Sequence, residues 1–134
     1  MKWLSLLLLI VPLSAFGQQQ DDPIGRYLLP PELVMSHSEQ IALTEKQRAL
    51  IKSEIQKMQA KFIDLQWDLQ EQTGKITQLL QQAPADEGKI LEQADKIMGL
   101  EREIKRSHLA LLVRIKNALT AEQIARLEAI RRTK

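Results

Sequence analysis

Apolar residues recur along most of the chain at alternating steps of four and three residues. After residue 44 the stripe consists of Ile51, Ile55, Met58, Phe62, Leu65, Leu69, Ile76 and Leu79, with Gln72 in the gap after Leu69. This heptad spacing predicts a long amphipathic helix from Glu45 to about Gln82. The turn signal Ala83-Pro84-Ala85-Asp86 follows it.

A second stripe begins directly after this turn. It consists of Ile90, Ala94, Ile97, Glu101, Ile104, His108, Leu111, Ile115 and Ala118. The stripe predicts a second long helix from near Glu87, with Asp86 as its N-cap. Two long striped helices joined by a short turn predict an all-α antiparallel hairpin. Facing residue numbers should sum to roughly 170, which places His108 opposite Phe62.

One five-residue motif occurs twice. Leu43-Thr44-Glu45-Lys46-Gln47 is matched by Leu119-Thr120-Ala121-Glu122-Gln123. In each copy the threonine can cap a helix, and the glutamine three residues later can complete a capping box. The motifs predict helix starts at Glu45 and after Thr120, the last helix running to about Arg132. Ile124 completes a hydrophobic staple with Leu119, whereas Arg48 holds the equivalent position in the first copy.

The N-terminal 17 residues have the pattern of a secretory signal. Lys2 precedes a short apolar run, and small residues stand at Ala15 and Gly17, the −3 and −1 positions of a cleavage site. We expect cleavage after Gly17, and an exported, soluble protein without a transmembrane segment. Residues 18–30 are polar and then proline- and glycine-punctuated, which predicts a flexible leader. A helical domain, 31–134, would follow, opening with a short helix at Pro31.

The composition excludes several classes of function. The chain has no cysteine, so it holds no disulfide and no thiolate nucleophile. Nineteen Lys and Arg nearly balance 17 Asp and Glu, and only 4% of residues are aromatic, so we expect no nucleic-acid surface. No phosphate loop, HExxH pattern or serine nucleophile motif is present. We therefore expect a protein that is not an enzyme and that needs no cofactor.

A second apolar set lies beside the main stripes. On the second helix it consists of Leu91, Met98, Leu109, Leu112 and Val113. On the first helix Ile63 and Trp67 share one face off the stripe. A single hairpin buries little surface, so this set predicts a homodimer. Trp67 and its neighbours are equally candidates for a client-contact surface, and the N-terminal arm is a third possible cover for Trp67.

Paired Leu-Thr-x-x-Gln motifs around a helical hairpin, behind an export signal, resemble the Spy/CpxP family of periplasmic proteins. Relatives in that group include zinc-resistance-associated proteins and periplasmic heavy-metal sensors. The resemblance extends from about Pro31 to Lys134. It implies a periplasmic, all-helical, bent dimer that forms a shallow cradle. It also implies one of three roles: an ATP-independent chaperone, an adaptor that inhibits a membrane-bound stress sensor, or a metal sensor.

The segment Met35-Ser36-His37-Ser38-Glu39 contains candidate metal ligands. Imidazole, thioether and carboxylate groups suit zinc, nickel, cobalt or copper. The chain lacks the paired histidines that metal-sensing relatives carry, and His37 can equally be a surface residue in a connector. His108 is a further candidate ligand. On the seam it would otherwise act as a pH-responsive switch or as a polar residue that fixes the register.

The leading hypothesis is a periplasmic stress-response binding protein. It would hold unfolded or envelope proteins on an amphipathic helical surface, or contact a membrane-bound stress sensor, without nucleotide. A heavy-metal sensor or resistance protein is the alternative, and a structural dimerisation module without a client is the third.

Overall fold

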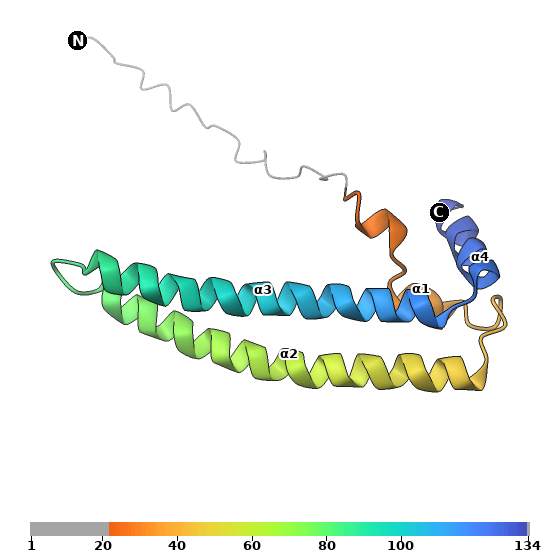
Figure 1. Ribbon diagram of the computed structural model, residues 1–134, viewed down its shortest axis with the longest axis horizontal. Helices are drawn as coiled ribbons and strands as arrows, with labels where there is room; N and C mark the ends of the chain where they lie inside the picture. The colour runs from red at the N-terminus through yellow and green to blue at the C-terminus, as the bar shows by residue number, and fades with distance from the viewer. Residues whose placement is uncertain (1–21, 134) are drawn as a thin grey trace, which may run out of the picture.

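The computed structural model describes residues 22–133, and all regular secondary structure in this part of the chain is helical. A 3₁₀ turn at Gly25–Tyr27 is followed by the helices α1 (Pro31–Ser36), α2 (Glu45–Leu80), α3 (Glu87–Ala118) and α4 (Ala121–Arg132). The long helices α2 and α3 run antiparallel, and the short helices gather at the end remote from their connecting turn (Figure 1). The predicted all-helical hairpin is confirmed. The predicted signal, 1–17, lies outside the described residues, as does the start of the leader.

Local caps set the starts of the three longer helices. The Thr44 hydroxyl accepts a hydrogen bond from the Gln47 backbone N–H at 3.1 Å, and the Asp86 carboxylate accepts one from Lys89 at 3.1 Å. Thr120 caps α4 in the same way as Thr44 caps α2. All three starts agree with the sequence prediction, because a cap needs only residues within one helical turn.

The turn between the long helices begins earlier than predicted. Helix α2 ends at Leu80 rather than near Gln82, and residues 81–86 form the connection. The hydrogen bonds between α2 and α3 therefore join residues whose numbers sum to 164–168 instead of 170, as in the pairs Lys61–Glu103 and Glu54–Arg114. The pairing of the two helices is otherwise the predicted one.

The fully buried core lies at the open end of the hairpin, opposite the turn. It draws on the arm before α1, α1 itself, the loop after α1, both long helices, the connection from α3 to α4, and α4. Its residues are Leu29, Val34, Ile41, Ile51, Leu111, Ile115, Leu119 and Leu127. Towards the turn, seam residues such as Phe62, Leu69 and Ile97 are only half-buried. Packing energy is therefore concentrated where the short helices join the hairpin.

The seam of α3 differs from the prediction over its middle turns. Glu101 and His108 are exposed, whereas Leu100 and Ser107 are half-buried at the interface. Burial of Leu100 removes apolar surface from water, while burial of an unpaired Glu101 carboxylate would cost free energy, so the helix turns Leu100 inwards. The predicted position of His108 opposite Phe62 is wrong. Both roles suggested for His108, the pH-responsive switch and the residue that fixes the register, required that position, so the structure does not support them.

The residues just before α1 are packed rather than free. Leu29 is 1% exposed. Arg131 of α4 donates hydrogen bonds to the backbone carbonyls of Gly25, Arg26 and Leu28, and Lys116 of α3 donates to that of Tyr27. Residues 22–30 thus form an arm held on α3 and α4, which differs from the flexible leader expected there.

Candidate functional site

The two repeated motifs meet at the open end through their glutamines. Gln47 Nε2 donates to Gln123 Oε1 at 2.7 Å, and Gln123 Nε2 donates back to Gln47 Oε1 at 2.9 Å. Each Oε1 also accepts from the backbone N–H of its own cap, Thr44 or Thr120. The same two amides therefore complete both capping boxes and join the start of α2 to the start of α4.

The remaining amide protons attach this pair to the backbone. Gln47 Nε2 donates to the carbonyl of Ala118 at the end of α3, and Gln123 Nε2 donates to that of Ile41 in the loop before α2. Each glutamine side chain then makes four hydrogen bonds, which uses both its amide protons and both carbonyl lone pairs. Leu43 is half-buried and Leu119 is buried beside the pair. These motif residues form a structural joint.

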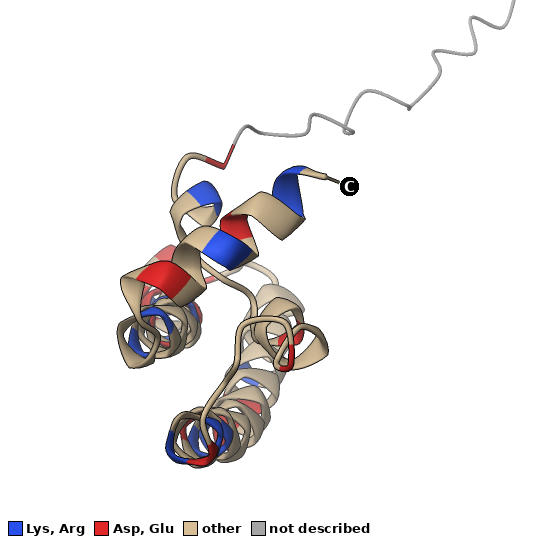
Figure 2. Ribbon diagram, turned by 90° about the vertical axis from the view of Figure 1, so that its right-hand side faces the viewer, with Lys and Arg blue, Asp and Glu red and all other residues tan. Residues whose placement is uncertain are grey.

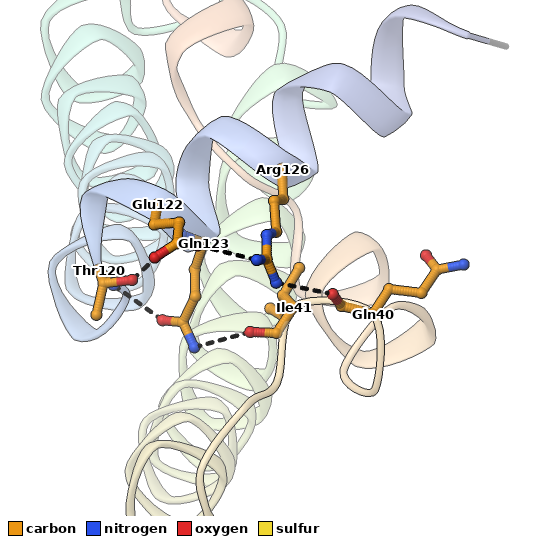
Figure 3. A network of polar contacts seen from close by, with 6 residues as sticks. All are labelled: Gln40, Ile41, Thr120, Glu122, Gln123 and Arg126. Carbon is orange, nitrogen blue, oxygen red and sulfur yellow. Dashed lines mark hydrogen bonds and ion pairs between the residues drawn. The ribbon is translucent and has the colours of Figure 1, made fainter.

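Arg126 extends the joint on the outer side of α4. Its guanidinium donates to the carbonyl of Gln40 at 3.4 Å and pairs with Glu122 at 2.9 Å (Figure 3). Ala42 adopts a φ of 51°, in the left-handed region, directly after Ile41, whose carbonyl accepts from Gln123. The loop between α1 and α2 is thus held to α4 by backbone carbonyls on two consecutive residues.

One flank of the hairpin carries exposed apolar side chains towards the turn. Ile63, Leu91 and Met98 each follow directly after a seam residue, and we call this set the apolar flank. Lys61 and Glu103 each precede a seam residue and pair across the other flank. In an antiparallel pair, positions that follow the seam on both helices lie on the same side. Ile63, Leu91 and Met98 are 54%, 57% and 50% exposed.

Trp67 lies on the outer surface of α2, at the same part of the hairpin. It is 67% exposed, and the cross-helix register places it level with residues 97–101, which include Met98. The arm of residues 22–30 binds α3 and α4 instead, so it does not cover Trp67. Leu109 and Val113 of α3 are each 42% exposed, and Leu112 is half-buried. The candidate client or dimer residues are therefore accessible for the most part.

The opposite flank is polar and is linked by ion pairs. Arg114 pairs with Glu54 at 3.1 Å, and Lys61 pairs with Glu103. The hydrogen bond and positive charge of Lys61 hold the pKa of Glu103 below its ordinary value of 4.5. Viewed from the open end, the long helices carry both basic and acidic residues (Figure 2). The basic residues of α3 thus belong to a mixed, solvated surface.

The structure places the candidate metal ligands on separate elements. Met35, near the end of α1, is 61% exposed, and His37 follows that helix. The Nδ1 atom of His37 lies 2.8 Å from the Leu33 carbonyl oxygen. His108 is exposed on α3. Over residues 22–133, no three His, Cys, Asp or Glu side chains come together as a potential metal site.

A groove beside α1 was not predicted. It has a volume of about 440 Å³ and lies between α1 and the first turns of α2, next to Leu43 and Arg48. The sequence signal that marks it is the missing staple, because Arg48 occupies the position where the second motif has Ile124. No helix within the described part of the chain is both long and apolar enough to cross a membrane.

Comparison with known proteins identifies a family for this chain. The family model for heavy-metal resistance matches residues 5–126, which is most of the 134-residue chain and includes both motifs. No curated protein and no solved structure matches the chain. The matched family is part of the Spy/CpxP-like group with paired Leu-Thr-x-x-Gln motifs, so the resemblance seen in the sequence is confirmed at that level. The chain belongs to the heavy-metal resistance family.

Proposed function

We propose that the protein contributes to metal resistance as a binding protein that holds partly unfolded proteins on the apolar flank, in the cell envelope and without nucleotide. The family supports a role in resistance to heavy metals. The observation that carries the mode of action is the set of large apolar side chains left open to water there. Ile63, Leu91 and Met98 are all at least half exposed, and Trp67 is more exposed still.

Physical chemistry connects this surface to a client. Soft metal ions bind thiolates and imidazoles of other proteins, and the proteins they disrupt expose apolar segments. Contact between such a segment and the apolar flank removes apolar surface from water on both partners. The flank is a row of single side chains on a rigid two-helix frame, so each contact with a client buries little apolar area. Release of the client therefore needs no energy source. Exposed charged residues such as Arg102 and Lys105 keep the surface between the apolar side chains hydrated.

The proposal is tested by aggregation of a client. A chemically unfolded enzyme is diluted into buffer without nucleotide, and light scattering is followed with increasing amounts of the purified protein. We expect suppression at a few-fold molar excess, weakened at least about threefold in a variant with Ile63→Ser and Met98→Ser. Leu50→Ser is the matched control, because Leu50 is as exposed as Met98 at 50% but precedes a seam residue and lies on the other flank. Absence of suppression at any excess would reject the proposal.

A second copy of the chain is the competing occupant of the same flank. Dimerisation would bury Trp67 and its neighbours and would compete with clients for them. Sedimentation equilibrium of the protein and of the Ile63→Ser, Met98→Ser variant separates the two cases. A dimer that dissociates in the variant, together with unchanged suppression of aggregation, would assign the flank to self-association.

Metal sensing through His37 is the second candidate function. A carbonyl oxygen can only accept a hydrogen bond, so the contact with Leu33 places the imidazole proton on Nδ1 and leaves the Nε2 lone pair for a metal. Met35, two residues earlier, has an exposed thioether. Calorimetric titration with zinc, nickel, cobalt and copper tests this function. It requires a Kd below about 0.1 mM that is lost in His37→Ala and retained in His108→Ala.

A further inference from the structure

The groove between α1 and α2 has an apolar floor that belongs to the folded core. Val34 of α1 and Ile51 of α2 form this floor and are 0% and 3% exposed. Leu43 and Ile55 continue the apolar lining on either side of Ile51. Core packing therefore fixes the shape of the groove. Its volume of about 440 Å³ lies within the range of small-molecule pockets in proteins.

Two cations line the groove on the solvent side. Arg48 and Lys52 are one helical turn apart on α2, and both are exposed. Within residues 22–133 neither makes an ion pair or a side-chain hydrogen bond, in contrast to Lys61 and Arg114 on the polar flank. No carboxylate lines the groove. An apolar channel is thus edged by two positive charges that lack partners within the described chain.

The groove lies where the two repeated motifs differ. In the second motif Leu119 is buried at 8% exposure, and Ile124 is half-buried at the staple position. In the first motif the staple position holds Arg48, so no aliphatic side chain closes over Leu43. Arg48, which stands where the second motif has Ile124, therefore leaves the apolar surface open and also supplies one of the two positive charges.

We propose that this groove binds a single-chain anionic amphiphile, such as a long-chain carboxylate. The alkyl chain would lie over Ile51 and Ile55, where each buried methylene contributes to affinity. The carboxylate would lie between Arg48 and Lys52, and Arg in particular donates two parallel hydrogen bonds to such a group. A cationic amphiphile of the same length would meet the same floor but be repelled at the edge. The site is separate from the apolar flank and does not depend on client binding there.

Titration calorimetry with dodecanoate below its micelle concentration tests the proposal. We expect saturable binding that is roughly tenfold tighter than that of dodecyltrimethylammonium, and affinity that rises from octanoate to dodecanoate as the groove fills. A variant with Arg48→Gln and Lys52→Gln should bind dodecanoate at least about tenfold more weakly. Its circular dichroism should be unchanged, because both side chains are exposed.

The matched control is Lys89→Gln with Lys96→Gln. These exposed lysines of α3 do not line the groove, and their replacement changes the net charge by the same amount. Equal weakening in the control, equal binding of the cationic amphiphile, or no dependence on chain length would overturn the proposal. Saturable binding that is absent for dodecanoate but present for phosphatidylglycerol vesicles would also overturn it, in favour of a membrane surface.

Discussion

Gln47 and Gln123 stand 76 positions apart in the chain, and their side-chain amides donate hydrogen bonds to one another. Each amide also closes the capping box of its own helix. The repeated motif therefore acts at two levels. Locally it starts a helix, and through the glutamine pair it attaches that helix to the other copy of the motif.

Replacement of Gln123 by alanine should destabilise the fold. Gln123 is 7% exposed, and its removal takes the glutamine partner from the Ile41 carbonyl and from the Thr120 N–H. It also removes two of the four hydrogen bonds of the Gln47 side chain. We expect the free energy of unfolding to fall by about 2 kcal/mol, measured by urea denaturation. Gln70→Ala is the control, because Gln70 is exposed on α2 and a change there should stay within about 0.5 kcal/mol.

A double-mutant cycle tests the pairing itself. Because Gln47 and Gln123 lose the same two mutual hydrogen bonds, the variant with both replaced by alanine should be more stable than the sum of the single losses predicts, by about 1 kcal/mol. Additive losses would mean that the two motifs act only as separate caps.

A second glutamine pair lies within the seam of the hairpin. Gln93 is 6% exposed and donates to both the carbonyl and the side-chain oxygen of Gln72. Gln93→Ala should cost about 1 kcal/mol in the free energy of unfolding, whereas leucine at both positions should leave it unchanged or raised, because no polar group is then left unpaired. Thermal denaturation of the two variants measures this. A double leucine variant less stable than Gln93→Ala would contradict the interpretation.

Local and periodic features were predictable from the sequence, and contacts to distant backbone were not. The starts at Glu45, Glu87 and Ala121 follow from caps within one turn, and the heptad stripe specified which helices pair. The sequence contains no signal for the bonds from Arg131 to the arm, since any residue offers a carbonyl oxygen. The exchange between the two motifs was equally hidden, because capping chemistry explains each glutamine without the other.

The α3 seam shows how a periodic pattern can be misread. Counting fours and threes from Ile90 leads to Glu101 and His108, while a shift of one residue leads to Leu100 and Ser107, which the structure buries in part. Periodicity alone does not choose between the two. The cost of burying a carboxylate does.

The ion pair of Glu103 with Lys61 should make the free energy of unfolding depend weakly on pH in the acidic range. The hydrogen bond from Lys61 lowers the folded-state pKa of Glu103 below 4.5. The contribution is therefore present above about pH 4.5 and is lost as the pH falls through the lower, folded-state pKa. NMR titration of the Glu103 carboxyl should give a pKa below 4.5 that rises in Lys61→Gln. The pKa of Glu71, lowered by Lys75, should not move in that variant and serves as the internal control.

His108 should prove dispensable for folding. Its side chain is exposed on α3, so His108→Ala should change the free energy of unfolding by less than about 0.5 kcal/mol. Urea denaturation measures it. A clearly larger loss would show that the side chain packs between the helices.

The hydrogen bonds of Arg131 should be what holds the arm of residues 22–30 against the helices. Its guanidinium donates to three successive parts of the arm, at Gly25, Arg26 and Leu28, which no shorter or single-headed cation can reproduce. In Arg131→Ala we expect backbone amide exchange over residues 22–30 to accelerate at least about tenfold, while exchange in the middle of α2 stays unchanged. Arg131→Lys should give an intermediate rate, because the ammonium keeps the charge and loses the fork of donors. Arg132→Ala is the matched control, since Arg132 is the exposed neighbour on α4 and, among residues 22–133, forms an ion pair with Glu128 alone. Equal acceleration in Arg132→Ala would show that charge at the end of α4, rather than the bonds of Arg131, holds the arm.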